Sequence, residues 1–80
     1  LLVEFKGDRW AIELKVWRDG KADPLADGLA QLDQYMSGLG LDVGWLVIFD
    51  RRSNQPPIAD RTSMEFHESP SHRNVTVIRA

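Results

Sequence analysis

The chain has 80 residues, a net charge of −2, 42% hydrophobic residues and no cysteine. A chain of this length forms one small domain, and the lack of cysteine excludes disulfides and thiolate metal sites. The charge balance shows no basic stripe of the kind that marks many nucleic-acid-binding proteins. No apolar run approaches the roughly 20 residues needed to cross a bilayer, so we expect a cytoplasmic domain without a membrane partner.

Two strands joined as a hairpin are predicted at the start of the chain. Residues 1–6 and 9–17 are strand-like runs separated by Gly7-Asp8, a pair typical of two-residue hairpin turns. In the second run, alternation places Trp10, Ile12, Leu14 and Val16 on one face and Ala11, Glu13, Lys15 and Trp17 on the other. We expect the first face to belong to the core. Since Leu1 reads as part of a strand already begun, we expect residues 1–80 to be a fragment that lacks the N-terminal part of its domain.

An amphipathic helix is predicted to follow the hairpin. Asp23 is a suitable N-cap and Pro24 a suitable first helical residue. Apolar residues then recur at helical spacing, and two glycines offer a stop: Leu25, Leu29, Leu32, Met36 and Leu39, then Gly38 and Gly40. Gly28, Gln31 and Tyr35 form a ridge beside this stripe, where the glycine would allow close approach to another surface.

The remaining segments predict further strands. Residues 43–49 are almost wholly apolar, which predicts a central strand covered on both sides, with Trp45 in the core. A strand, a helix and a second strand make a crossover, so the two strands should be parallel. Residues 51–73 read as a loop in which 63–67 can form a short strand, and 74–79 read as a final edge strand. The predicted fold class is α/β with a mixed sheet, in the order β-hairpin, helix, parallel strand, loop, edge strand.

Glu13 and Lys15 carry the chemical signal of the sequence. They stand two positions apart within an apolar strand, so both side chains point to the same region of space. Sixteen residues after Lys15 comes Gln31, and Tyr35 follows one helical turn later. This pattern resembles the PD-(D/E)xK phosphodiesterase superfamily, in particular its RecB-type branch, in which an acid-x-Lys strand precedes a helix that carries Gln-x-x-x-Tyr. The resemblance covers residues 1–50 and implies the C-terminal part of a restriction-endonuclease-like core.

The resemblance implies metal-dependent phosphodiester hydrolysis of nucleic acid, with DNA preferred over RNA as the partner. Glu13 would be catalytic and would bind Mg²⁺ or Mn²⁺ together with the carbonyl of Leu14. Lys15 would be the second catalytic residue, lowering the pKa of the attacking water or holding phosphate charge. Gln31 and Tyr35 would contact substrate or orient Lys15. From its position beside Lys15, Trp17 is a further candidate, because aromatic rings stack on nucleic-acid bases.

One part of the family pattern is missing. The family places a further aspartate, within a Pro-Asp pair, on the strand before the acid-x-Lys strand, and no Pro-Asp precedes Glu13. We expect that aspartate immediately before Leu1, although Glu4 and Asp8 are also near. The 80 residues alone should therefore be inactive. The alternative is an inactive PD-(D/E)xK-like module for docking or regulation, as found C-terminal to bacterial P-loop ATPase domains, and a third is an unrelated α/β fragment used for protein interaction.

Each candidate residue also has a non-functional interpretation. Glu-x-Lys occurs by chance in many strands, and as an exposed ion pair it contributes at most about 1 kcal/mol. Taken alone, Tyr35 fits the edge of a core and Gln31 a solvated helix position. His67 and His72 show no ligand spacing, so we interpret them as solvated side chains.

Overall fold

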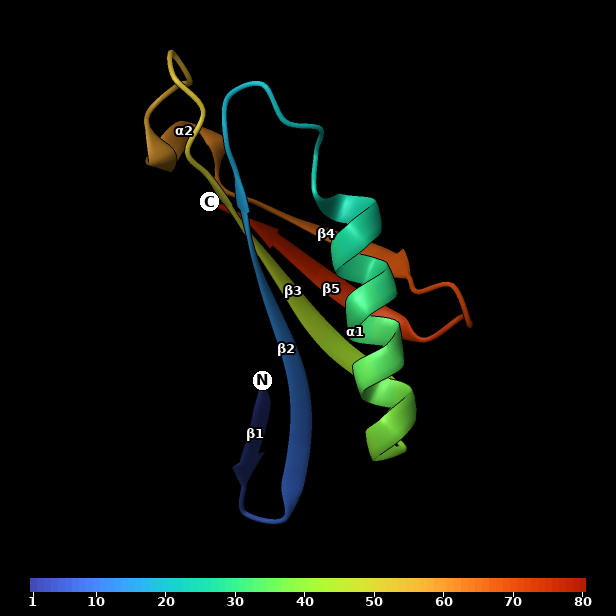
Figure 1. Ribbon diagram of the computed structural model, residues 1–80. Helices are drawn as coiled ribbons and strands as arrows, with labels where there is room; N and C mark the ends of the chain where they lie inside the picture. Colours follow the sequence, from blue (N-terminus) through green and yellow to red (C-terminus); the bar gives the residue numbers. More distant parts are fainter.

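The protein, described over all 80 residues by a computed structural model, is a five-stranded mixed sheet with one long helix on one face (Figure 1). The elements are β1 (Leu2–Phe5), β2 (Asp8–Trp17), α1 (Leu25–Leu39), β3 (Val43–Asp50), α2 (Ile58–Arg61), β4 (Ser63–Glu68) and β5 (Asn74–Arg79). The strand order across the sheet is β1-β2-β3-β5-β4. The predicted α/β class with a mixed sheet is confirmed. Neither helix is both long and apolar enough to span a membrane.

The first two strands form the predicted antiparallel hairpin, but its turn lies one residue earlier than expected. Phe5 pairs with Asp8, so the two turn residues are Lys6 and Gly7 rather than Gly7 and Asp8. Both turn residues have positive φ, 52° and 84°, as a tight hairpin turn requires. Asp8 is thereby free to begin β2.

Helix α1 ends where the sequence indicates but begins one residue later than predicted, with Pro24 rather than Asp23 as its N-cap. The carboxylate of Asp23 accepts a hydrogen bond from the backbone N–H of Leu25 at 3.0 Å, which satisfies one of the unpaired donors of the first turn. Gly40 ends the helix in the left-handed conformation, with φ 69°, which glycine adopts without strain. Three side-chain positions of the helix are buried against the sheet, at Gly28, Leu32 and Met36.

Close approach between α1 and the sheet depends on two glycines. A Cβ at Gly28 would lie 2.7 Å from a methyl carbon of Leu46 in β3, and one at Gly44 would lie 2.7 Å from the sulfur of Met36. Neither space could hold a side chain without movement of its neighbours. The close contact predicted for Gly28 is confirmed, and its neighbour is β3.

The core lies on the face of the sheet that α1 covers. Its fully buried side chains are Ala11, Leu32, Met36, Leu46, Ile48, Val75 and Val77. The prediction that Trp10 and its neighbours in β2 face the core is therefore wrong, and Trp45 is likewise only half-buried. The prediction that β3 is covered on both sides is wrong for the same reason, because its residues alternate between buried and half-buried. The helix packs where small residues let it come close, and those lie on the Ala11 face.

Strand β5 was predicted to be an edge strand, and this is wrong. It pairs in parallel with β3 and antiparallel with β4, so β4 forms the edge. The predicted parallel pairing of β2 and β3 is confirmed, as is a strand near residues 63–67. The short helix α2 was not predicted. The turn between β4 and β5 is tied to α1, because Ser69 and Ser71 both donate hydrogen bonds to the carboxylate of Asp33.

Candidate active site

Glu13 and Lys15 lie side by side on the covered face of β2. Glu13 pairs in register with Leu46 of β3, and Lys15 pairs with Ile48. Both charged side chains are half-buried, and neither takes part in any ion pair of the structure. A carboxylate and an ammonium group are thus held at the margin of the core without protein partners.

The carbonyl of Leu14 points, in the plane of the sheet, toward the side of β2 on which β1 lies. The backbone N–H of Ile12 donates to the carbonyl of Leu1 at 2.7 Å, so the N–H and C=O groups of Ile12 point toward β1. Leu14 has the same orientation, because backbone groups alternate along a strand. In this register the residue opposite Leu14 would precede Leu1, so no residue of the described chain pairs with this carbonyl.

Gln31 and Tyr35 lie on the flank of α1 that faces β2. Asp33 is bound to the β4–β5 turn, and Gln31 stands about 160° from it around the helix, toward the other side of the sheet. Gln31 is exposed, whereas the half-buried ring of Tyr35 packs against the buried core. The structure thus places Gln31 and Tyr35 on the side of the helix nearest Glu13 and Lys15, with Tyr35 also contributing to packing.

Trp17 lies at the end of β2, on the same face as Lys15. The guanidinium carbon of Arg52 lies 3.5 Å from the centroid of the Trp17 ring, and the indole N–H donates to the carbonyl of Lys21 at 2.9 Å. One face of the ring is therefore already occupied. Stacking of a base on Trp17 stays a prediction, and it requires the other face or displacement of Arg52.

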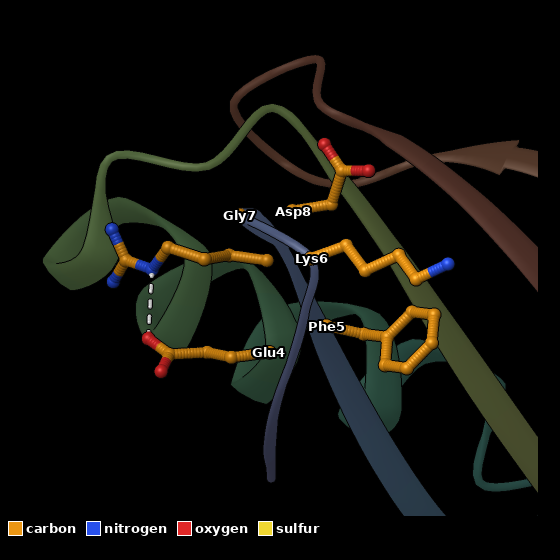
Figure 2. A pocket seen from close by; sticks show the side chains of 6 residues that line it. Glu4, Phe5, Lys6, Gly7 and Asp8 are labelled. Carbon is orange, nitrogen blue, oxygen red and sulfur yellow. Dashed lines mark ion pairs between the residues drawn. The ribbon is translucent and has the colours of Figure 1, made fainter.

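The other acidic residues near the hairpin do not reach Glu13. Glu4 forms an ion pair with Arg9 at 3.4 Å, drawn in Figure 2, and Arg9 is four positions from Glu13, about 13 Å along the strand. Asp8 lies in the next register position, on the opposite face of β2. Figure 2 shows the side chains of Glu4 and Phe5 projecting in opposite directions from β1. No group of three or more acidic, histidine or cysteine side chains is arranged to hold a metal ion.

A network of charged side chains that the sequence did not indicate lies at the carboxyl ends of β3 and β5. Arg52 donates two hydrogen bonds to the carboxylate of Asp50, at 2.9 and 2.7 Å, and Arg61 donates to the Asp50 backbone carbonyl at 2.8 Å. The bonds from Arg52, assisted by the charge of Arg61, lower the pKa of the Asp50 carboxyl from 3.8 to about 2. The Nε of Arg61 is buried and has no hydrogen-bond partner.

Arg79 forms the second half of this network. It donates to Asp23 at 2.9 Å and to Glu65 at 2.8 Å. The side chain of His67 lies 2.8 Å from Glu65, and its hydrogen bond, followed by those from Arg79, lowers the pKa of the Glu65 carboxyl. His72 is exposed beside Glu68, so the interpretation of both histidines as freely solvated holds only for His72.

The network encloses a hollow of about 290 Å³ lined by residues that include Trp17, Asp50, Arg52, Arg61 and Arg79. Its three arginines form ion pairs with three carboxylates, Asp50, Asp23 and Glu65, of which only Asp50 lines the hollow. The network therefore fastens the loop around α2 and the start of α1 to the sheet. Asp50 and Arg79 end neighbouring parallel strands, so their proximity could be inferred only with the correct position of β5.

Comparison with known proteins adds no relative. No protein-family model matches the chain, and no match was found among curated proteins or solved structures.

Proposed function

We propose that this chain carries the acid-x-Lys half of a metal-dependent nuclease site of PD-(D/E)xK type, which hydrolyses phosphodiester bonds in nucleic acid, DNA in preference to RNA. The observation that carries the proposal is the placement of Glu13 and Lys15 on one face of β2 without protein partners. The antiparallel hairpin, α1 and the parallel strand β3 support it, because the resemblance implies that order of elements.

Two oxygen donors fit a Mg²⁺ or Mn²⁺ ion, the carboxylate of Glu13 and the carbonyl of Leu14. Both ions prefer oxygen ligands, and Mg²⁺ retains several waters. Such an ion, when bound, would activate a water molecule and neutralise phosphate charge. One carboxylate and one carbonyl leave an octahedral ion short of protein ligands, so catalysis calls for a second carboxylate.

The register of the hairpin defines where that second carboxylate would lie. Leu2 pairs with Ala11, and Glu4 pairs with Arg9. Continued in the same register, a residue directly before Leu1 would lie opposite Glu13 and on the same face of the sheet. An aspartate there would bring two carboxylates together, with Cβ atoms about 5 Å apart.

The remaining residues would act on the substrate. Lys15 lies about 7 Å from Glu13 along the strand, and its ammonium group would hold the phosphate charge that develops during attack. Gln31 is exposed on the near flank of α1 and would donate a hydrogen bond to a phosphate or base. The hydroxyl of Tyr35 would act beside it, while its ring stays packed on the core.

The alternative function is an inactive docking or regulatory module attached to an ATPase domain. The ion pair between Glu4 and Arg9 favours it, because this pair removes the nearest acid of β1 from the reach of Glu13. The two functions differ in their dependence on Glu13. A nuclease requires that carboxylate, whereas a docking module does not.

Nuclease assays on the natural polypeptide that carries these 80 residues test the proposal. Glu13→Gln and Lys15→Ala should each lower Mg²⁺- or Mn²⁺-dependent cleavage by about a hundredfold or more, with unchanged far-ultraviolet circular dichroism. Glu68→Gln serves as the matched control, because Glu68 is an exposed residue of β4 that faces away from α1, and it should cleave normally. Undiminished cleavage by Glu13→Gln would contradict the assignment.

A further inference from the structure

The face of the sheet opposite α1 is apolar and uncovered. Two rows of register-paired residues cross four strands on this side, Ile12-Trp45-Thr76-Phe66 and Leu14-Val47-Ile78-Met64. We call these eight residues, together with Val3 and Trp10 beside them, the open face. Thr76 is its only polar member, and no member is charged. Monomeric soluble proteins rarely expose apolar patches larger than a few hundred Å².

The open face carries both a protrusion and a hollow. Phe66 on the edge strand β4 is 80% exposed. At the other side of the face, Val3, Trp10, Ile12 and Trp45 line a hollow of about 340 Å³ whose wall is wholly hydrophobic. The protrusion and the hollow lie in the same row, since Ile12, Trp45 and Phe66 are linked by strand pairing through Thr76.

We propose that the open face binds a second copy of this chain, face to face, around a two-fold axis parallel to the strands. Rotation about such an axis reverses the order of the strands across the second sheet. It leaves each row of paired residues at the same position along the strands. Strands β2 and β4 are about three strand spacings apart, at equal distances from an axis that runs between β3 and β5. Rotation about this axis would therefore place Phe66 on β4 of each copy over β2, and so over the hollow, of the other. The contact is self-complementary, as a two-fold interface requires.

Area and composition favour a second copy over a small ligand. A small ligand would fill only the hollow, whereas the exposed apolar surface continues across the sheet to Leu14, Met64 and Phe66, which are 51%, 58% and 80% exposed; a second copy can cover all of it. Aromatic residues and methionine are enriched and charged residues depleted at the cores of such interfaces, as they are here. The short side chain of Thr76 beside the axis allows the two sheets to approach closely.

Sedimentation equilibrium of the purified protein tests the proposal. The unchanged chain should form a concentration-dependent dimer, and Phe66→Asp should raise its dissociation constant by about a hundredfold or more, since the aromatic ring that would fill the partner's hollow is lost. Because Phe66 is largely exposed, this substitution should not unfold the monomer, which circular dichroism would verify. Ile58→Asp is the matched control, since Ile58 is 53% exposed on α2 and outside the open face, and it should still dimerise.

Cross-linking tests the arrangement of the two copies. The chain has no cysteine, so single cysteines can be introduced at Thr76 or Phe66 and treated with a short bismaleimide linker. With sheets about 10 Å apart and strands about 4.8 Å apart, the two Thr76→Cys Cα atoms would lie on the order of 11 Å from each other and the two Phe66→Cys Cα atoms about 17 Å. Thr76→Cys should therefore cross-link much faster.

Two results would overturn the proposal. One is a protein that stays monomeric up to millimolar concentration, or a dimer that Phe66→Asp leaves intact. The other is a Phe66→Cys variant that cross-links as fast as Thr76→Cys, because the protrusions would then lie against each other rather than over the hollows. A monomer whose open face is covered by a different protein counts among the overturning results.

Discussion

The two faces of the sheet differ in burial and in hydrophobicity, and the more hydrophobic face is the one that no helix covers. The covered face contains small residues and two half-buried charges in β2, whereas the open face holds large apolar side chains that no element covers. The helix lies against Ala11 and Gly44 because their small size lets it approach, and Gly28 adds space from the helix side. Burial in this protein is therefore decided by steric access rather than by the apolar pattern of β2 alone.

The difference also bears on function. Half-burying a charged group without a partner is unfavourable, so the fold gains no stability from Glu13 and Lys15 beneath the flank of α1. Apolar residues of similar size at these positions would pack better. Proteins often place residues that are unfavourable for packing at functional sites, which supports the covered face as the chemical face.

The largest expected effect comes from matched leucine truncations on the two faces. Leu46 is fully buried and Leu14 is 51% exposed. Leu46→Ala should lower the free energy of unfolding by about 3 kcal/mol, whereas Leu14→Ala should lower it by less than about 1 kcal/mol. Urea denaturation at low protein concentration, where association is absent, measures both. Equal losses would show that both faces are buried to the same degree.

Two glycines of the same helix sharpen the comparison. A Cβ at Gly28 would collide with Leu46, while one at Gly38 would meet nothing within 4 Å. Gly38→Ala should raise the free energy of unfolding by about 0.5–1 kcal/mol, the difference in helix propensity. Gly28→Ala should instead lower it by about 1–2 kcal/mol, because overpacking outweighs that gain. Stabilisation by both substitutions would mean that α1 does not lie this close to β3.

The flank of α1 that faces β2 is predicted to act on substrate rather than in folding. Gln31→Ala combined with Tyr35→Phe should lower cleavage, or nucleic-acid affinity if the domain is inactive, about tenfold, which corresponds to about 1.4 kcal/mol. The melting temperature should change little, because the phenylalanine ring preserves the packing of Tyr35 on the core. Gln34→Ala, at another exposed position of α1, is the control. Early melting with normal activity would make the pair structural.

The smallest effect concerns the charged network at the carboxyl ends of the strands. The Asp50 carboxyl has a pKa of about 2 in the folded state against 3.8 ordinarily, so its contribution to stability is present above pH 3.8 and is lost as the pH falls toward 2. Asp50→Asn should therefore be less stable at neutral pH and should lose less stability in this acid range. Asp60→Asn, exposed on α2, should follow the unchanged protein. Parallel acid denaturation curves for all three would contradict the prediction.

Much of the fold could be predicted from local signals, because each rests on a few neighbouring residues. The stop at Gly40 and the apolar run of β3 are of this kind. The place of β5 could not be predicted, because it depends on pairing between distant segments. The choice of covered face failed for a similar reason, since β2 is apolar on one side and small or charged on the other, and only the helix decides between them.

The candidate site divides in the same way. The common face of Glu13 and Lys15 follows from strand alternation, and the flank of Gln31 and Tyr35 follows from helical spacing. The direction of the Leu14 carbonyl, toward the side of β2 on which β1 lies, could be assigned only from the hydrogen bond between Ile12 and Leu1. The network around Asp50 joins four separate elements, so no local pattern could indicate it.

Binding of Mn²⁺ to the isotope-labelled 80-residue protein, followed by nuclear magnetic resonance, tests the central claim most directly. Paramagnetic broadening should be strongest at the backbone amides of Glu13, Leu14 and Lys15, at weak affinity because one carboxylate is the only acidic ligand there. Glu13→Gln should abolish it. Broadening centred instead on Asp50 and Glu65, or broadening near Leu14 that persists in Glu13→Gln, would show that the acid-x-Lys strand is not the metal site.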